Sequence, residues 1–260
     1  MIQYIASDVD GTLLHGHATT LNPELFDIIR QLKERGIHFI AASGRQYENL
    51  RHLFAPVKDD ISYVAENGSM CVHDDKIVSL GHIDTDLIYE IADAAKEYGH
   101  CHTLISTART GYTDSQDPDY IDHIHNDVGY NMDVVQNVRD IKEPFIKIAV
   151  CDFDGTEKRL RAYFQERFGD RIKIVTSGNI WIDFIAPNAN KGSALSNIVS
   201  SLGMDPKNGI TFGDQYNDLE MLQLSNTSYD MTTAATGVAD YATHTTDSVE
   251  KTLREFLQTL

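Results

Sequence analysis

The sequence predicts an α/β protein with a doubly wound, Rossmann-like parallel sheet and an inserted α/β cap domain. Two observations lead to this prediction. Apolar runs of strand length alternate with amphipathic helices at the start of the chain, and the same alternation resumes after Pro187. Between residues 83 and 186 the pattern changes to short strands and tight turns, which is typical of a mixed or antiparallel sheet. We therefore expect one domain formed by residues 1–82 and 187–260, and a second domain of residues 83–186 inserted into it.

The core elements follow from hydrophobic periodicity and from helix start and stop signals. Asn22-Pro23-Glu24 supplies a cap, a first-turn proline and a first-turn acid, and the helix that it opens ends at Gly36. The other expected core elements are strands at 4–7, 37–42, 63–65 and 210–212 and helices around Leu50, around Leu195 to Leu202, and from Val249 to Leu257.

The cap elements are read in the same way. A helix that carries Leu87 and Ile91 is closed by Gly99, and a hairpin is expected through Gly111. The remaining expected cap elements are strands at 145–150, 172–176 and 180–185 and a helix that carries Leu160, Phe164 and Phe168.

Composition excludes several classes of partner. The 260 residues include 22 Lys and Arg against 39 Asp and Glu, a formal charge of −17, which argues against binding to nucleic acid or to an anionic membrane. Three widely spaced cysteines suggest neither a disulfide framework nor a zinc site. The sequence shows no signal-peptide pattern and no run long enough to span a membrane, so we expect a cytoplasmic protein.

Two carboxylates, Asp8 and Asp10, directly follow the first strand, and Gly11 lets the chain turn sharply after them. In open parallel sheets, ligands bind at the carboxyl ends of the strands. A pair of acids there suits phosphoryl transfer through an aspartyl-phosphate. One acid attacks phosphorus, and the other protonates the leaving oxygen and later activates water. Because the nucleophile and the phosphate are both anionic, the reaction needs cationic charge, usually Mg²⁺ and a lysine.

Three further residues at strand ends or helix starts answer these needs. Ser43 offers its hydroxyl, and the backbone N–H groups of the helix that follows, to phosphate oxygens. Lys191 supplies a point charge for the developing anion. Asp214, together with a carboxylate oxygen of Asp8, suits Mg²⁺, which takes hard oxygen ligands.

The ordered set resembles the haloacid dehalogenase-like superfamily of phosphatases, and within it the Cof-type subfamily with a large α/β cap. The resemblance covers essentially the whole chain, and it implies that residues 1–82 and 187–260 form the catalytic core and that residues 83–186 form a cap that selects the substrate. The matching strings, in motif order, are Asp8-Val9-Asp10-Gly11-Thr12, Ser43-Gly44-Arg45, Lys191-Gly192, and Gly213-Asp214 through Asn217-Asp218, with Glu66-Asn67-Gly68 resembling a subfamily signature.

The resemblance implies a role for each of these residues. Asp8 is the expected nucleophile and Asp10 the general acid and base. The expected metal ligands are Asp8, Asp214 and the backbone carbonyl of Asp10. Ser43 and Lys191 are expected to bind phosphate. Asn217 is expected to bind phosphate or to orient Asp214, and Asp218 to bind metal-held water or to brace Lys191. Arg45 and Asn67 are expected to lie near the substrate or cap. The sequence departs from the family pattern at Gln215 and in the stretch from Asp230 to Ala235.

The expected function is therefore Mg²⁺-dependent hydrolysis of a small phosphorylated metabolite by a monomer or homodimer. Sugar, nucleotide and cofactor phosphates stay open as substrates. Two alternatives are a phosphomutase or phosphotransferase of the same superfamily, and a non-catalytic regulator that binds a phosphometabolite.

The cap contains a second copy of the first motif, Asp152-Phe153-Asp154-Gly155-Thr156, with Ser177-Gly178 downstream. Only one Lys-Gly and one Gly-Asp-x-x-Asn-Asp string follow, so a second complete site is not expected. The strand at 180–185 stands where the first copy has a helix, which indicates a hairpin. We expect Asp152 and Asp154 to cap the helix that contains Leu160.

Overall fold

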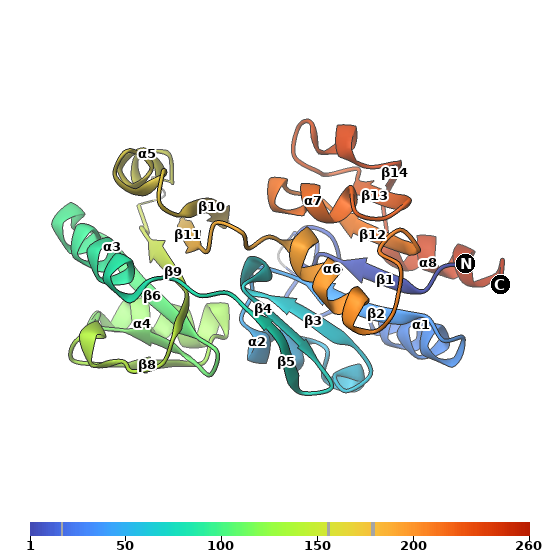
Figure 1. Cartoon of the computed structure of the whole chain (residues 1–260), viewed down its shortest axis with the longest axis horizontal. Helices are drawn as coiled ribbons and strands as arrows, with labels where there is room; N and C mark the ends of the chain where they lie inside the picture. The colour runs from blue at the N-terminus through green and yellow to red at the C-terminus, as the bar shows by residue number, and fades with distance from the viewer. Residues whose placement is uncertain (17, 155–156, 178–179) are drawn as a thin grey trace. The chain divides into compact units, whose positions relative to one another are not determined.

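A computed structural model gives the structure of the chain and describes residues 1–16, 18–154, 157–177 and 180–260 (Figure 1). The chain divides into two compact units: residues 1–79 with 190–260, called the core unit here, and residues 80–189, called the inserted unit. The predicted fold class is confirmed, because a largely parallel sheet with helices carries a second α/β unit within its sequence. The functional division between the units stays a prediction.

The core unit contains an eight-stranded sheet in the order β14-β13-β12-β1-β2-β3-β4-β5. Its strands are β1 (Tyr4–Ser7), β2 (His38–Ala42), β3 (Ser62–Ala65), β4 (Met70–His73), β5 (Lys76–Leu80), β12 (Gly209–Gly213), β13 (Thr227–Met231) and β14 (His244–Thr246). Its α-helices are α1 (Pro23–Glu34), α2 (Tyr47–Leu53), α6 (Lys191–Ser201), α7 (Leu219–Leu222) and α8 (Val249–Leu257).

The parallel part of this sheet forms as the sequence predicts. Asn22 caps α1 by accepting a hydrogen bond from the Glu24 N–H. Tyr4 and Ala6 of β1 pack into an apolar cluster with residues of α6, while the alternate residues of a strand point to the opposite face. Strand β1 lies between β2 and β12 and is parallel to both, so the carboxyl ends of all three strands reach one edge of the sheet.

The sequence did not predict the strands β4, β5, β13 and β14 or the short helix α7. Strand β4 runs antiparallel to β3, which adds an antiparallel edge to the parallel sheet. Such an edge is common in α/β folds.

The inserted unit has a six-stranded mixed sheet in the order β10-β11-β9-β6-β7-β8. Its strands are β6 (His102–Thr107), β7 (Gly111–Thr113), β8 (Met132–Val134), β9 (Phe145–Cys151), β10 (Lys173–Ser177) and β11 (Trp181–Ile185). Its helices are α3 (Thr85–Tyr98), α4 (Pro118–Asp122), a π-helix (His123–Val128) and α5 (Glu157–Phe168). Ile88 of α3 and Phe164 of α5 share one apolar cluster with Phe184 of β11. Within the described residues, no helix is long and apolar enough to span a bilayer.

The second D-x-D string lies directly after β9 of the inserted unit. Asp152 is buried, and its carboxylate accepts a hydrogen bond from the Asp154 backbone N–H. Strands β10 and β11 are antiparallel, which confirms the expected hairpin. Gly155, Thr156 and Gly178 lie outside the described residues, so capping of α5 by the two acids stays a prediction.

Candidate active site

The carboxyl edge of the core sheet brings together residues that are far apart in the sequence. Asp8, Ser43 and Asp214 each directly follow one of the neighbouring strands β1, β2 and β12, and all three are buried. Lys191 is the first residue of α6, whose cap Asn190 accepts a hydrogen bond from the Ser193 N–H. Because the edge is common to parallel strands, the fold itself assembles this cluster.

Lys191 joins two of the buried carboxylates. Its Nζ donates to Asp8 Oδ1 at 2.5 Å and to Asp218 Oδ1 at 2.6 Å. Asp218 Oδ2 accepts from the backbone N–H groups of Asp214 and Gln215, both at 3.0 Å. Both oxygens of Asp218 are thus engaged, and this residue braces Lys191 and the turn after β12. The position beside Lys191 was one of the two expected from the resemblance.

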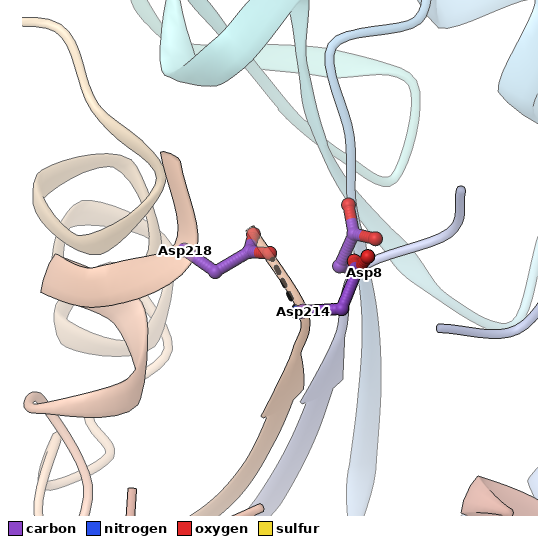
Figure 2. Close-up of side chains that lie close together, drawn as sticks. All are labelled: Asp8, Asp214 and Asp218. Carbon is purple, nitrogen blue, oxygen red and sulfur yellow. Dashed lines mark hydrogen bonds between the residues drawn. The ribbon is translucent and has the colours of Figure 1, made fainter. Parts of the chain in front are cut away.

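Asp8, Asp214 and Asp218 form an acidic cluster in which one oxygen from each lies within 4.8 Å of the others. Figure 2 shows Asp8 and Asp214 extending from neighbouring strands, with the Asp218 carboxylate directed toward the Asp214 backbone. Thr12 Oγ1 and Gln215 Nε2 each donate to one oxygen of Asp214 at 3.1 Å. Sequence reasoning did not assign these two supports, although Thr12 belongs to the D-x-D-G-T string.

The cluster has the donor set that Mg²⁺ requires. Asp8 Oδ2 is buried and has no hydrogen-bond partner among the described residues, whereas Oδ1 is bound to Lys191. When ionised, the three carboxylates and the single ammonium leave two negative charges uncompensated. A divalent cation would balance this charge and satisfy the unpartnered oxygen, so the residues present fit the metal.

The electrostatics agree with this fit. Burial raises the pKa of Asp8 well above its usual range; Lys191 opposes the rise, while Asp218 and Asp214 add to it. Burial raises the pKa of Asp214, and the negative charge of Asp218 makes the second-largest contribution to this rise. Burial alone would lower the pKa of Lys191, but Asp218 and Asp8 outweigh it and raise that pKa, so the lysine stays charged.

Asp10 lies apart from this buried cluster, with a half-exposed side chain. Arg45 Nε and Nη2 donate to the two Asp10 oxygens at 2.8 and 2.7 Å, a bidentate pairing. Ser43 Oγ accepts from the Arg45 N–H at 3.1 Å and lies 3.5 Å from Asp10 Oδ2. Asp10, Ser43 and Arg45 therefore form a second group at the same edge. The contact of Arg45 with Asp10 had no signal in the sequence.

Asn67 and Asn217 meet at this edge from opposite parts of the chain. Asn217 Nδ2 donates to Asn67 Oδ1 at 3.0 Å, and Asn67 is buried. The expected position of Asn67 near the substrate or cap stays a prediction. In the structure its side chain contacts Asn217, another candidate site residue.

The fold and the site together define a protein of Rossmann-like architecture with a cluster of buried carboxylates at the carboxyl edge of its parallel sheet. Within this class, the chain belongs to the haloacid dehalogenase-like hydrolases, whose family model matches residues 5–252. The resemblance read from the motifs is thereby confirmed, as is the predicted enzyme class, a phosphatase of this family.

Individual relatives are similar over nearly the full chain. The 5-amino-6-(5-phospho-D-ribitylamino)uracil phosphatase YbjI of Escherichia coli is 28% identical, over 91% of this chain and 88% of its own. The HMP-PP phosphatase of Citrobacter koseri is 27% identical, and the match covers 86% of this chain and 81% of that protein. A crystal structure from Eubacterium rectale aligns with a TM-score of 0.87 at 26% identity, covering 98% of this chain and 99% of the other.

Proposed function

We propose that the protein hydrolyses a small phosphate monoester through an aspartyl-phosphate on Asp8, with Mg²⁺ as cofactor. The observation that carries the proposal is the state of Asp8: a buried carboxylate with one oxygen bound to Lys191 and the other without a partner among the described residues. Mg²⁺, held by Asp8, Asp214 and the Asp10 carbonyl, would supply positive charge that lets a carboxylate approach a phosphate.

In the first step, an oxygen of Asp8 attacks phosphorus and the bond from phosphorus to the ester oxygen breaks. Protonated Asp10 gives its proton to the leaving oxygen, so that an alcohol departs. Lys191 neutralises charge beside the nucleophile. Arg45 would orient Asp10 when it is the carboxylate that serves as base in the second step, since the Arg45 guanidinium binds both Asp10 oxygens.

In the second step, the Asp10 carboxylate takes a proton from water, whose oxygen attacks phosphorus. The bond between phosphorus and Asp8 breaks, which releases inorganic phosphate and restores the Asp8 carboxylate. The hydroxyl of Ser43 and the amide of Asn217 would hold phosphate oxygens during both steps.

A panel of phosphate esters assayed with Mg²⁺ and with excess chelator tests the proposal. The panel should include the 5-phospho-D-ribitylamino compound and HMP-PP named in the two relatives. We expect Mg²⁺-dependent release of phosphate from at least one ester. Full turnover in chelator would contradict the role of the metal, and no turnover of any ester would contradict the function.

Asp10→Asn is expected to form phosphoenzyme slowly and to release it more slowly still. The amide can neither protonate the leaving oxygen nor activate water, and the second step has no alternative activation. Rapid quench with ³²P-labelled substrate should detect an accumulating acid-stable, base-labile phosphoenzyme on Asp8. Wild-type rates of both steps would exclude Asp10 as the acid and base.

Mg²⁺ is expected to raise the melting temperature more at about pH 8 than at about pH 5. The raised pKa values of Asp8 and Asp214 mean that the folded, metal-free protein binds more protons than the unfolded chain. Its stability therefore falls as pH rises from the usual aspartate pKa, about 4, to the raised values, and a metal reverses this loss. Scanning fluorimetry at matched ionic strength measures the difference. Equal shifts at both pH values, or an unchanged shift in Asp214→Asn, would contradict this site.

The inserted unit is proposed to select the substrate, since Ser43, Lys191 and Asp214 serve only phosphate and metal. Replacing residues 83–186 with the matching segment of the YbjI phosphatase should shift the ranking of esters toward that of YbjI. The assay is kcat/KM over the panel for the parent and the chimaera. A ranking that stays with the core unit would contradict this division.

A further inference from the structure

The turn after β3 has a backbone conformation that sequence analysis did not anticipate. Glu66, Asn67 and Gly68 have φ values of 52°, 55° and 93°, so three consecutive residues lie in the left-handed region. For residues other than glycine, this region costs free energy and persists only where the surroundings impose it. Strain of this kind is often found at functional sites.

The surroundings of this turn are the other segments of the site. Asn67 N–H donates to the Ser43 carbonyl and Glu66 N–H to the Arg45 carbonyl, both at 3.0 Å. A Cβ on Gly68 would lie 2.4 Å from the carbonyl oxygen of Asn190, the residue before Lys191. The turn therefore packs directly against the loop of Ser43 and against the start of the helix that carries Lys191.

The Asn67 side chain makes the third connection. Its Oδ1 accepts from Asn217 Nδ2, and its amide packs so closely on Gly44 that a Cβ there would lie 3.0 Å away. This hydrogen bond determines which way the Asn217 amide faces. The Asn217 Nδ2 group carries two N–H bonds and donates one of them to Asn67, so the other N–H can donate to a phosphate oxygen, whereas the buried Asn217 Oδ1 is an acceptor and cannot.

We infer that Asn67 is a positioning residue for the phosphate site, which acts by fixing the orientation of the Asn217 amide. The inference rests on the proposed function. The left-handed backbone places Asn67 Oδ1 where it can accept from Asn217, and the contacts with Ser43, Gly44 and Asn190 maintain that backbone. Asn67 itself does not need to touch the substrate.

A double-mutant cycle with Asn67→Gly and Asn217→Ala tests this inference. Glycine accepts the left-handed backbone, so Asn67→Gly removes the side chain without adding strain. We expect it to lower kcat/KM about 10- to 100-fold in the wild-type background. In the Asn217→Ala background the same change should cost less than about twofold, because the amide to be oriented is gone. Equal losses in both backgrounds would overturn the inference.

His100→Gly is the matched control, because His100 is an exposed residue with φ of 56° that is distant in sequence from the site motifs. It should leave kcat/KM unchanged. A readout independent of turnover is the side-chain amide pair of Asn217 in ¹H–¹⁵N spectra, identified by its loss in Asn217→Ala. The chemical shifts of that pair of signals should change in Asn67→Gly and remain unchanged in His100→Gly. Unchanged chemical shifts of this pair in Asn67→Gly would contradict the hydrogen bond between Asn67 and Asn217, on which the inference depends.

The two proposals fail in different ways. If the wild-type protein hydrolyses no ester, the proposed function fails, whatever the spectra show. If the wild type is active and Asp8→Asn is not, but the cycle is additive, the function stands and the role of Asn67 is wrong.

Discussion

Replacing Asp8 with asparagine is expected to lower kcat for phosphate-ester hydrolysis on the order of 10⁴-fold or more, because the nucleophile is lost. An amide is a poor nucleophile, and it also removes the charge that faces Lys191 at 2.5 Å. Steady-state assays with Mg²⁺ measure the loss, and mass spectrometry should find no phosphoenzyme in the variant. Near-normal turnover would exclude the aspartyl-phosphate mechanism.

The second D-x-D-G-T string provides the matched control for this experiment. Asp152→Asn and Asp154→Asn change the equivalent residues in the inserted unit, whose sequence contains no Lys-Gly string and no Gly-Asp-x-x-Asn-Asp string. Both variants should keep kcat within a few-fold of wild type. A loss in either one as severe as that expected for Asp8→Asn would contradict the assignment of catalysis to the first copy alone.

Replacing Lys191 with methionine is expected to abolish turnover and to lower the free energy of unfolding by about 3–5 kcal/mol in metal-free buffer. Methionine has a similar length, but it leaves the buried carboxylates of Asp8 and Asp218 without their common cation. Urea unfolding, with and without Mg²⁺, measures the effect, and the metal should recover part of the lost stability.

Lys207→Met is the control for this change. Lys207 is an exposed residue of the same unit, and within the described part of the chain its ammonium hydrogen-bonds only the Gln223 carbonyl, at 3.3 Å. Its replacement should change stability by less than about 0.5 kcal/mol. If Lys191→Met unfolds at the wild-type urea concentration, the buried ion pairs do not have the role assigned to them.

The sequence predicted the gathering of Asp8, Ser43 and Asp214 because it depends on one topological rule. Apolar runs identify the strands, and polar residues directly after parallel strands must share an edge. Strand β13 escaped prediction because its residues, Thr227–Met231, include Ser and Asp and lack a strong apolar run.

Side-chain partners could not be predicted in the same way. Asn67 and Asn217 are separated by 150 residues, and nothing in either string specifies a contact between two amides. The pairing of Arg45 with Asp10 depends on a side-chain rotamer, and the left-handed turn at Glu66-Asn67 runs against local preference, so tertiary packing decides both.

The order of strands in the core sheet also has a consequence for synthesis on the ribosome. The inserted unit is continuous over residues 80–189, so it emerges complete before the core unit does. Strand β1 gains β2 early, but its other neighbour, β12, ends at residue 213, so one side of β1 stays unpaired until most of the chain has been made. Nascent chains that stop before β12 would therefore expose an apolar strand edge beside a finished insert, which is the state that chaperones bind. Limited proteolysis of stalled nascent chains would then find the insert protected first, while β1 is still open to cleavage.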